Sequence, residues 1–474
     1  MTKYPRVCIA AGWSGAGKTT FSCGLLKALI GRGIRPAAFK CGPDFIDPMF
    51  HREVLGAHSS NLDLFLLDET AAKTLVRENM DGKDMAVMEG VMGFYDGIGG
   101  AAARASTWHI ASVTKTPVIL VEDCAASGMT AVSRIKGMTA FREPSMIAGA
   151  VINNCGETLF RDLKSAIENE TFLKVYGFLP RMKEYRIESR HLGLVTAAEI
   201  EDLREIIAGI AARIESTVDV EGIIELGNRA PGIDLEETGI GNCAGENSPP
   251  SLCGGVCGAK SGTKAESCCR VAIARDKVFC FYYEDALNQL RRTGAELVFF
   301  SPLYDRRLPA DIKGLYFGGG YPELYAETLS ENTEMLRNIR AAVERGTPTI
   351  AECGGFMYLH EELMDKTGAS YKMCGVLPGT CRPSPGLVHF GYAEYTALAD
   401  NLLCRAGESL RGHEFHYWVS DNPGGSFRAK KPRGDGEWSS IIATDTLFAG
   451  FPHFHWYAYP GMLERFLRSC ENHG

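Results

Sequence analysis

The sequence predicts an α/β protein with two domains, a first domain built on a parallel sheet and a second α/β domain. Over the first ~225 residues, short apolar runs alternate with longer helical patterns, which is typical of parallel strands covered by helices on both faces. A Gly-, Pro- and Ser-rich segment interrupts this pattern, which resumes near residue 270. We therefore expect a first domain over residues 1–228, a flexible linker over 229–268 and a second domain over 269–474. A chain of 474 residues fits this division.

The first domain opens with a strand over residues 6–11, an unbroken apolar run. A helix over 19–31 follows, with Phe21, Leu25, Leu26 and Leu29 on one face. Further apolar runs predict strands at 36–40, 85–89, 117–121 and 146–153. The intervening helical patterns complete the predicted parallel sheet.

The second domain begins with a strand over 271–276, a helix over 283–293 and a strand over 296–303. The run GLYF at 314–317 predicts another strand, and three glycines follow it directly. Residues 348–359 read as a strand, a sharp turn and a helix, with Cys353 at the turn.

A phosphate-binding loop lies between the first strand and the first helix. Residues 12–19, GWSGAGKT, match G-x-x-x-x-G-K-[ST] in the strand–loop–helix context that the motif requires. Glycines let backbone N–H groups approach phosphate oxygens, and Lys18 reaches the terminal phosphates. The predicted nucleotide-binding residues are Gly12, Gly15, Gly17, Lys18, Thr19 and Thr20. The expected ligand is ATP.

Acidic residues follow two neighbouring strands of this sheet. Asp44 comes after the second strand and Glu89 ends a later one. The carboxyl ends of parallel strands meet at one edge of the sheet, where ligands bind. The sequence therefore predicts a Mg²⁺ site formed by Thr19, Asp44 and Glu89.

A second candidate site centres on a cysteine. Small residues lie two positions before and after Cys353, which is typical of a nucleophile elbow, and the following helix favours a thiolate of lowered pKa. Gly319 and Gly320 lie where backbone amides can stabilise an oxyanion. His453 and His455 are candidate general bases that share one face if the segment is extended.

Composition excludes several classes of protein. The net charge of −8 argues against sequence-independent binding of nucleic acid. We find neither an apolar run of membrane-spanning length nor a signal peptide. We therefore expect a cytoplasmic protein whose 16 cysteines are mostly reduced. Five cysteines gather at 243–269, but their spacing does not favour zinc or iron–sulfur binding; they are Cys243, Cys253, Cys257, Cys268 and Cys269.

These residues support a family resemblance over nearly the whole chain outside the linker. The first half resembles P-loop synthetases of the dethiobiotin-synthetase type, and the second resembles class I ("triad") glutamine amidotransferases. Their fusion resembles the cobyrinic acid a,c-diamide synthase family. The resembling segments, in order, are KCGPDFIDPMF, EGVMGFYDG, SRHLGLV, VAIARDKVFCFYYED, FGGGYPELYAE, AECGGFMYL and RGHEFHYW.

The resemblance implies a carbon–nitrogen ligase in the anaerobic cobalamin pathway, which uses ATP and glutamine to amidate the a and c acetates of a corrinoid. Cys353 would attack glutamine and release ammonia, with Gly319 and Gly320 as oxyanion donors. His455 aligns with the base of the related F-H-P-E motif and is preferred to His453. The ammonia would pass to the first domain and attack an acyl phosphate made with ATP and Mg²⁺.

Other roles implied by the resemblance concern the substrate and the orientation of the base. The residues expected to face the substrate are Lys40, Asp44, Ile46 and Asp96. Trp456 and Tyr457 follow His455 where many triad enzymes have Pro-Glu. The site therefore acts as a Cys–His dyad, or another acid, with Glu414 as a speculative choice, orients the base.

Several alternatives stay open at this point. The same chemistry on hydrogenobyrinic acid or nickel-sirohydrochlorin is the nearest, and cobyric acid synthase is another. A regulatory P-loop ATPase with an inactive amidotransferase-like binding domain is the alternative of a different class. The expected partners are small molecules, namely corrinoid, glutamine and ATP, without nucleic acid or membrane. The oligomeric state, monomer or homodimer, is open.

Overall fold

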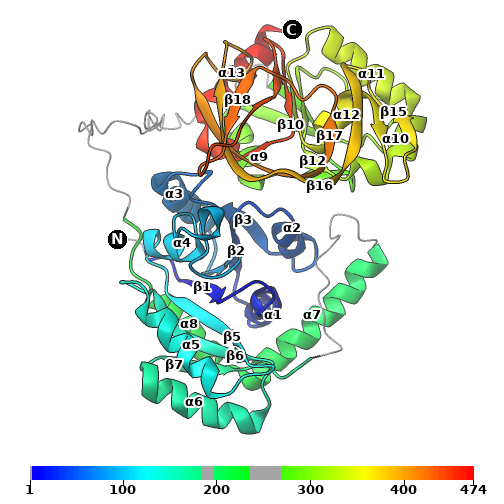
Figure 1. Cartoon of the computed structure of the whole chain (residues 1–474). Coiled ribbons are helices and arrows are strands. Elements are labelled where there is room, and N and C mark those ends of the chain that lie inside the picture. Colours follow the sequence, from blue (N-terminus) through cyan, green and yellow to red (C-terminus); the bar gives the residue numbers. More distant parts are fainter. Residues whose placement is uncertain (1–2, 183–196, 235–268, 474) are drawn as a thin grey trace, which may run out of the picture. The chain divides into compact units, whose positions relative to one another are not determined.

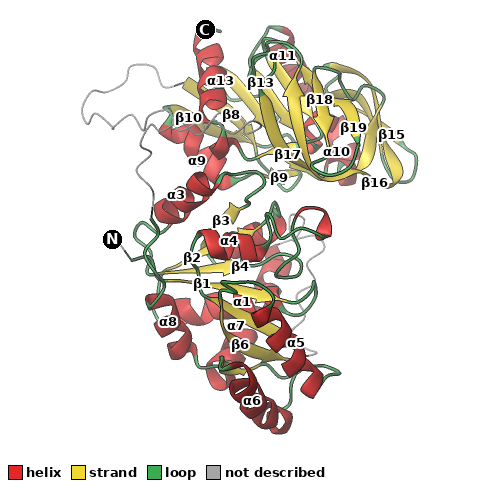
Figure 2. Cartoon of the chain, turned by 60° about the vertical axis from the view of Figure 1, so that its left-hand side comes forward, coloured by secondary structure: helices red, strands yellow, loops and turns green. Residues whose placement is uncertain are grey.

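A computed structural model describes residues 3–182, 197–234 and 269–473 (Figure 1). The chain divides into two compact units, Met1–Leu235 and Glu236–Gly474. Figure 2 shows helices flanking the strands of the first unit and a second unit that is richer in strands. The α/β class of both domains and the parallel sheet of the first are confirmed, and the second unit also contains parallel strands. The described residues contain no helix long and apolar enough to span a bilayer.

The first unit contains a seven-stranded sheet in the order β3-β2-β4-β1-β5-β6-β7, and every neighbouring pair is parallel. The strands are β1 Arg6–Ala11, β2 Pro36–Cys41, β3 His58–Leu62, β4 Met85–Glu89, β5 Val118–Asp123, β6 Ile147–Asn153 and β7 Lys174–Phe178. The helices are α1 Lys18–Gly31, α2 Ile46–Glu53, α3 Glu69–Asn79, α4 Thr107–Val113, α5 Met129–Ala140, α6 Glu157–Thr171, α7 Ala197–Thr217 and α8 Val220–Asn228, with a short 3₁₀ turn η1 at Ile98–Gly100.

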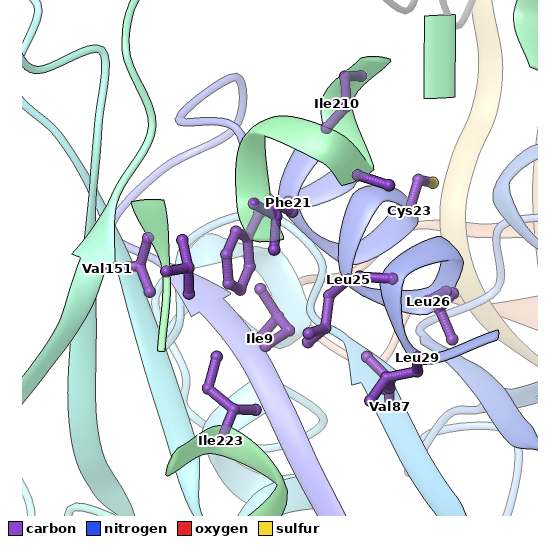
Figure 3. Packing of buried hydrophobic residues seen from close by; sticks show 14 of the residues in the cluster. Ile9, Phe21, Cys23, Leu25, Leu26, Leu29, Val87, Val151, Ile210 and Ile223 are labelled. Atoms are coloured by element: carbon purple, nitrogen blue, oxygen red, sulfur yellow. The ribbon is translucent and has the colours of Figure 1, made fainter. Parts of the chain in front are cut away.

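The core of this unit lies between the central strands and α1, α7 and α8. Phe21 of α1, Ile210 of α7 and Ile223 of α8 belong to one buried cluster with Ile9 of β1 (Figure 3). Helices α1 and α7 approach closely because residue 24 is glycine: a Cβ there would lie 2.5 Å from Ile210. This packing fixes the start of α1, and with it the loop that precedes the helix.

The predicted strands of this unit are present with bounds shifted by at most two residues. Strand β3, HSSNL, was not predicted because its residues are mostly polar. Asn61 in that strand is buried, and its side-chain amide donates to the carbonyl oxygens of Gly42 (3.0 Å) and Asp44 (2.7 Å). Polar side chains here stabilise the neighbouring loop, so hydrophobic periodicity fails to detect the strand.

Buried Arg6, in the first strand, forms hydrogen bonds with the segment that follows α8 at the end of the first unit; we call these contacts the Arg6 clamp. The Arg6 guanidinium donates hydrogen bonds to the carbonyl oxygens of Thr114 (2.7 Å) and Pro231 (2.6 Å). Ala230 is buried, and Lys115 forms an ion pair with Asp234 (2.9 Å). Residues 229–234, placed in the linker by composition, therefore pack against the first unit. The rest of the predicted linker lies outside the described residues.

The second unit contains a six-stranded sheet, β10-β8-β11-β13-β21-β20, in which the pairs between β10 and β21 are parallel. An antiparallel-rich sheet runs β15-β14-β16-β17-β22, with β18 paired to β16 and β19 paired to β18. Strands β9 and β12 pair separately.

The bounds of these strands are β8 Cys269–Ala274, β9 Phe279–Phe281, β10 Ala295–Phe300, β11 Gly314–Phe317, β12 Gly319–Gly320, β13 Thr349–Glu352, β14 His360–Met364, β15 Ser370–Lys372, β16 Leu377–Ala397, β17 Ser409–Ser420, β18 Phe427–Lys430, β19 Glu437–Ser440, β20 Ile442–Ala443, β21 Leu447–Gly450 and β22 His453–Phe454. The helical segments are α9 Glu284–Arg292, η3 Pro322–Leu324, α10 Ala326–Glu331, α11 Thr333–Glu344, α12 Gly354–Leu359, η4 Trp456–Ala458 and α13 Pro460–Asn472.

Candidate active sites

The phosphate loop follows β1 and opens α1, as predicted. Gly17 has φ 102°, and a Cβ there would lie 2.1 Å from the Asn153 side-chain nitrogen. That nitrogen donates to the Ala16 carbonyl oxygen (2.9 Å), so Asn153 at the end of β6 supports the loop. Glycine is required at 17 for both conformation and space.

Lys18 lies over this loop. Its ammonium donates to the carbonyl oxygens of Trp13 (2.9 Å) and Met92 (2.6 Å). Burial lowers the pKa of Lys18 to about 8, and the nearby Lys40 acts in the same direction. The two carbonyl oxygens carry only partial negative charge, so a phosphate oxygen would be a stronger partner for the Lys18 ammonium.

Glu89, at the end of β4, is the centre of a buried ionic cluster. It accepts hydrogen bonds from the Thr19 hydroxyl (2.6 Å) and the Lys40 ammonium (2.8 Å), and His51 Nε2 lies 3.5 Å from it. Burial acts to raise the pKa of Glu89, but Lys40 and His51 outweigh it and hold the pKa below its ordinary value. Glu89 is therefore an ionised oxygen donor beside the phosphate loop.

Two members of this cluster, Asp47 and His51, were missed from the sequence. Asp47 forms a buried ion pair with Lys40. Both lie on α2, within and just after the quoted segment KCGPDFIDPMF, so the resemblance could have indicated them. Lys40 is 4% exposed and bonded to two carboxylates. Its contacts therefore orient Glu89, and direct contact with a substrate stays a prediction.

The other predicted residues of the first unit lie around this cluster. Asp44 accepts the Ile46 backbone N–H (2.8 Å) at the start of α2. Asp96 accepts the Gly93 N–H (3.0 Å) and lies near enough to Lys18 to raise its pKa. Asp44 thus holds the loop between β2 and α2, and its role as a metal ligand stays a prediction.

The donor set fits Mg²⁺ at Thr19 and Glu89. A hydroxyl and an ionised carboxylate 2.6 Å apart are the hard oxygen donors that Mg²⁺ prefers, and they lie beside a phosphate loop. Cys23, His51 and Glu89 also present ligand atoms within 4.8 Å of one another. Sulfur and imidazole suit softer ions, so this trio is a poor magnesium site.

The turn at Cys353 has the predicted elbow geometry. Cys353 joins β13 to α12 with φ 46° and ψ −102°, a conformation that non-glycine residues rarely adopt. Gly355 permits it, because a Cβ there would lie 2.5 Å from Phe317. Strained backbone of this kind is typical of positions that present a nucleophile.

The expectation of a lowered thiol pKa is not met. Burial raises the pKa of Cys353 above its ordinary value, and Glu323, Glu414 and Glu352 add to the rise. The Gly354 backbone N–H opposes them and is outweighed. The neutral thiol is therefore favoured over the thiolate, chiefly because the sulfur is buried and secondly because of these carboxylates.

The glycines after β11 lie against this elbow. Gly320 has φ 151°, and a Cβ there would lie 1.7 Å from the Val278 carbonyl oxygen. A Cβ at Gly354 would lie 3.0 Å from the Gly320 nitrogen, and one at Gly319 would lie 3.4 Å from the Cys353 Cβ. Both predicted oxyanion donors are thus brought to the thiol, while their donor role remains a prediction.

The structure favours His453 over His455 as the partner of Cys353. A Cβ added at Gly319 would lie 2.3 Å from the His453 ring and 3.4 Å from the Cys353 Cβ. The imidazole ring and the Cys353 side chain therefore both lie next to Gly319. The ring of His455 instead stacks on Tyr283, with 4.4 Å between centroids. The two histidines do not share an extended segment, because β22 ends at Phe454 and His455 has φ −87° and ψ 84°. We therefore propose His453 as the base in place of His455.

The acid facing His453 is Glu352, which the sequence analysis missed. Its carboxylate lies 3.8 Å from His453 Nδ1 and accepts hydrogen bonds from the Trp456 indole (2.8 Å) and the Tyr316 hydroxyl (3.2 Å). Glu352 directly precedes Cys353 in β13. Only the adjacency in AECGG could have indicated it.

Glu414, the speculative orienting acid, has other partners. It accepts hydrogen bonds from the Tyr395 hydroxyl (2.6 Å) and from His416 Nε2 (2.7 Å). Strand β17 turns Glu414 and His416 inward, while Phe415 and Tyr417 are exposed. Glu414 therefore stabilises the interior of this sheet and influences Cys353 only through its charge.

Two sets of predicted features lie outside the described residues. The segment SRHLGLV, residues 189–195, is one. The linker cysteines at 243, 253, 257 and 268 are the other. Cys269 is described, buried at the start of β8, and is a free thiol like the other cysteines in the described ranges.

Comparisons with known proteins agree with this two-site arrangement. Residues 7–195 match the CobQ/CobB/MinD/ParA nucleotide binding domain, and 270–459 match the CobB/CobQ-like glutamine amidotransferase domain. Cobyrinate a,c-diamide synthase of Caldanaerobacter subterraneus subsp. tengcongensis is 37% identical over 470 residues, 98% of each chain. That of Priestia megaterium is 35% identical over 98% of this chain and 97% of its own. A MinD structure from Aquifex aeolicus matches 49% of this chain and 99% of its own at TM-score 0.30 and 15% identity, too weakly to add to this.

Proposed function

Because the chain belongs to the cobyrinate a,c-diamide synthase family, we propose that it amidates the a and c acetate carboxylates of cobyrinate, with ATP and glutamine. One observation carries the proposal: a single chain holds a phosphate loop with an ionised acid and a thiol elbow with a histidine. The pair suits a reaction in which one site frees ammonia and the other activates a carboxylate.

At the thiol site, Cys353 Sγ attacks the carboxamide carbon of glutamine while His453 accepts the thiol proton. The Gly319 and Gly320 amides would stabilise the oxyanion that develops on the carbonyl oxygen. Collapse of the tetrahedral intermediate releases ammonia, protonated through His453, and leaves a thioester. Water then hydrolyses the thioester to glutamate and regenerates the thiol.

Glu352 is a positioning residue in this scheme. A carboxylate beside Nδ1 favours the tautomer that leaves Nε2 free to accept a proton. It also stabilises the imidazolium that forms during attack. Two hydrogen bonds, from Trp456 and Tyr316, hold Glu352 for this task.

At the phosphate site, Lys18 and the loop amides bind ATP, and the substrate carboxylate takes the terminal phosphoryl group. Ammonia then attacks the acyl phosphate and phosphate leaves. Phosphate is a much better leaving group than the hydroxide that the free carboxylate would have to lose. Thr19 and Glu89 would hold Mg²⁺, which screens phosphate charge when bound. Lys40 and His51 keep Glu89 ionised and oriented.

The proposal extends to a cytoplasmic location, where thiols such as Cys353 remain reduced. It leaves the order of the two amidations and the oligomeric state open. Hydrogenobyrinate and nickel-sirohydrochlorin are the competing substrates, because we assign no residue of either site to contact with the central metal of the tetrapyrrole.

The decisive experiment offers the purified protein MgATP, glutamine and each tetrapyrrole in turn, and determines product masses. We expect cobyrinate to gain two amides in place of two hydroxyls, with one ATP consumed for each amide. A parallel reaction with ammonium in place of glutamine isolates the phosphate site. Amidation of another tetrapyrrole alone would reject cobyrinate as the substrate, and no amidation with either nitrogen source would reject the proposed function.

A further inference from the structure

An aromatic cluster that the reaction scheme above does not use lies at the surface of the first unit. Phe141 caps the C-terminus of α5 and is 62% exposed. Between ring centroids, Tyr95 in the loop after β4 lies 5.0 Å from Phe141 and 6.2 Å from Trp108 of α4. The exposed Arg142 guanidinium lies over the Phe141 ring (5.3 Å) and the Trp108 ring (5.5 Å). We call these four residues the aromatic rim.

Two contacts join the aromatic rim to the phosphate loop. The Tyr95 hydroxyl donates to the Met138 carbonyl oxygen in α5 (2.6 Å), and a Cβ added at Gly12 would lie 3.5 Å from Met138 Sδ. The loop that carries Tyr95 also supplies the Met92 carbonyl oxygen, which accepts a hydrogen bond from the Lys18 ammonium (2.6 Å). Because the lysine of a phosphate loop reaches the terminal phosphates, this loop borders the place of phosphoryl transfer.

The composition of the aromatic rim indicates the kind of ligand that would cover it. Single exposed apolar side chains are common in folded proteins, but here an exposed ring borders the phosphate site together with two further aromatic rings and a cation. The complementary ligand has a conjugated apolar face and an anionic group. A tetrapyrrole with peripheral carboxylates has both, and one of its carboxylates has to reach the terminal phosphate. Adenine also has a conjugated face, but it lies at the opposite end of the triphosphate and carries no anion.

We propose that the aromatic rim binds the tetrapyrrole substrate, with the macrocycle against Phe141 and a peripheral carboxylate that is not being amidated paired with Arg142. The inference rests on the proposed function, because it takes the reacting carboxylate to be phosphorylated beside Lys18. Tyr95 and Trp108 are positioning residues. Their rings, and the hydrogen bond from the Tyr95 hydroxyl to α5, hold Phe141 and Arg142 beside the phosphate loop.

The test measures binding of cobyrinate to the full-length protein by isothermal titration calorimetry, with Mg²⁺ and a non-hydrolysable ATP analogue present. Phe141→Ala and Arg142→Gln are compared with wild type and with two matched controls, Phe172→Ala and Arg161→Gln. Phe172 caps α6 and Arg161 lies within it, and both are exposed and belong to neither candidate site. The KM values for cobyrinate and for ATP are determined in parallel, with ammonium as the nitrogen source.

We expect Phe141→Ala to raise both Kd and KM for cobyrinate by about 10-fold, as for the loss of one stacking ring. Arg142→Gln should raise them by about 5-fold at low salt and by less at high salt, because salt screens an exposed ion pair. KM for ATP should change little in either variant. Both controls should match wild type.

Unchanged affinity for cobyrinate in Phe141→Ala and Arg142→Gln would overturn this inference and leave the proposed function intact. An increase confined to KM for ATP would also overturn it, and would assign the aromatic rim to the adenine base. If Phe141→Ala does not fold, Arg142→Gln decides: a weaker salt dependence of cobyrinate binding supports the inference, and an unchanged salt dependence rejects it.

Failure of the proposed function gives a different result. If wild type amidates another tetrapyrrole in place of cobyrinate, the same four variants are compared with that compound, and the same outcomes support or reject the role of the aromatic rim. A wild type that amidates no tetrapyrrole with either nitrogen source would reject the proposed function, and this inference with it.

Discussion

The two candidate sites occupy similar places in their sheets and treat buried charge in opposite ways. At the phosphate site, Glu89 is surrounded by Lys40, His51 and the Thr19 hydroxyl, and its pKa is held low. At the thiol site, burial raises the pKa of Cys353, and acidic neighbours add to the rise. The phosphate site therefore stabilises an ionised group, whereas the thiol site disfavours the thiolate.

This difference lies in the groups that surround each reacting residue: cations around Glu89, and a buried, acidic environment around Cys353. The predictions below test this contrast between the sites, from the largest expected effect to the smallest.

Cys353→Ala should separate the sites most sharply. It removes the nucleophile, so we expect glutamine-dependent amidation to fall by about 10⁵-fold or more, to background. Amidation with ammonium should remain within a few-fold of wild type, because the phosphate site is untouched. Product formation with each nitrogen source measures both. If the folded variant loses activity with both sources, the sites are not separable.

Lys18→Ala should affect both nitrogen sources equally. Losing the cation that faces the phosphates should lower kcat by about 10²–10³-fold with glutamine and with ammonium alike. The rate of amide formation under saturating substrate measures this, with Lys27→Ala in the same helix as the control. Retained turnover would contradict the assignment of the loop.

His453→Ala and His455→Ala test the proposed choice of His453 as the base. We expect His453→Ala to lower glutamine hydrolysis by about 10²-fold or more, since it removes the proton acceptor. His455→Ala should lower it less and should mainly lower Tm, because the ring is buried against Tyr283. Glutaminase assays and thermal melts distinguish the two. The reverse order of glutaminase effects would restore His455.

Glu352→Gln should have the smallest effect, about 10-fold on glutamine hydrolysis, since it removes an orienting charge but no reacting atom. The neutral amide stabilises imidazolium less, so the rise of kcat/KM with pH should begin at a lower pH than in wild type. A pH–rate profile reads this shift, which a purely structural role would not produce. An unchanged pH–rate profile together with a lowered Tm would show that Glu352 has only a structural role.

The fold and both motifs could be read from the sequence because backbone constraints leave local marks. Gly17 and Gly355 are required by contacts that any side chain would violate, so their spacing survives as a pattern. The partners could not be read in this way. Whether His453 or His455 faces the thiol depends on where β22 ends, and hydrophobic patterning does not fix a two-residue strand.

The same reasoning applies to the missed acids. Glu352 was overlooked because its partner lies about a hundred residues away, in β22. Asp47 was overlooked because a charged residue on a short helix usually faces solvent, whereas here Lys40 holds it inside. Ionic pairs across distant segments are set by the tertiary fold, and single-sequence patterns carry little information about them.

The Arg6 clamp has a consequence for how the first unit is made. The guanidinium sits in the first strand, but one of its acceptors, the Pro231 carbonyl, is synthesised more than two hundred residues later. A ribosome-bound chain that ends before that point carries a buried cation with part of its hydrogen bonding unmet. The emerging unit therefore cannot complete its native hydrogen bonding until the segment after α8 has left the exit tunnel.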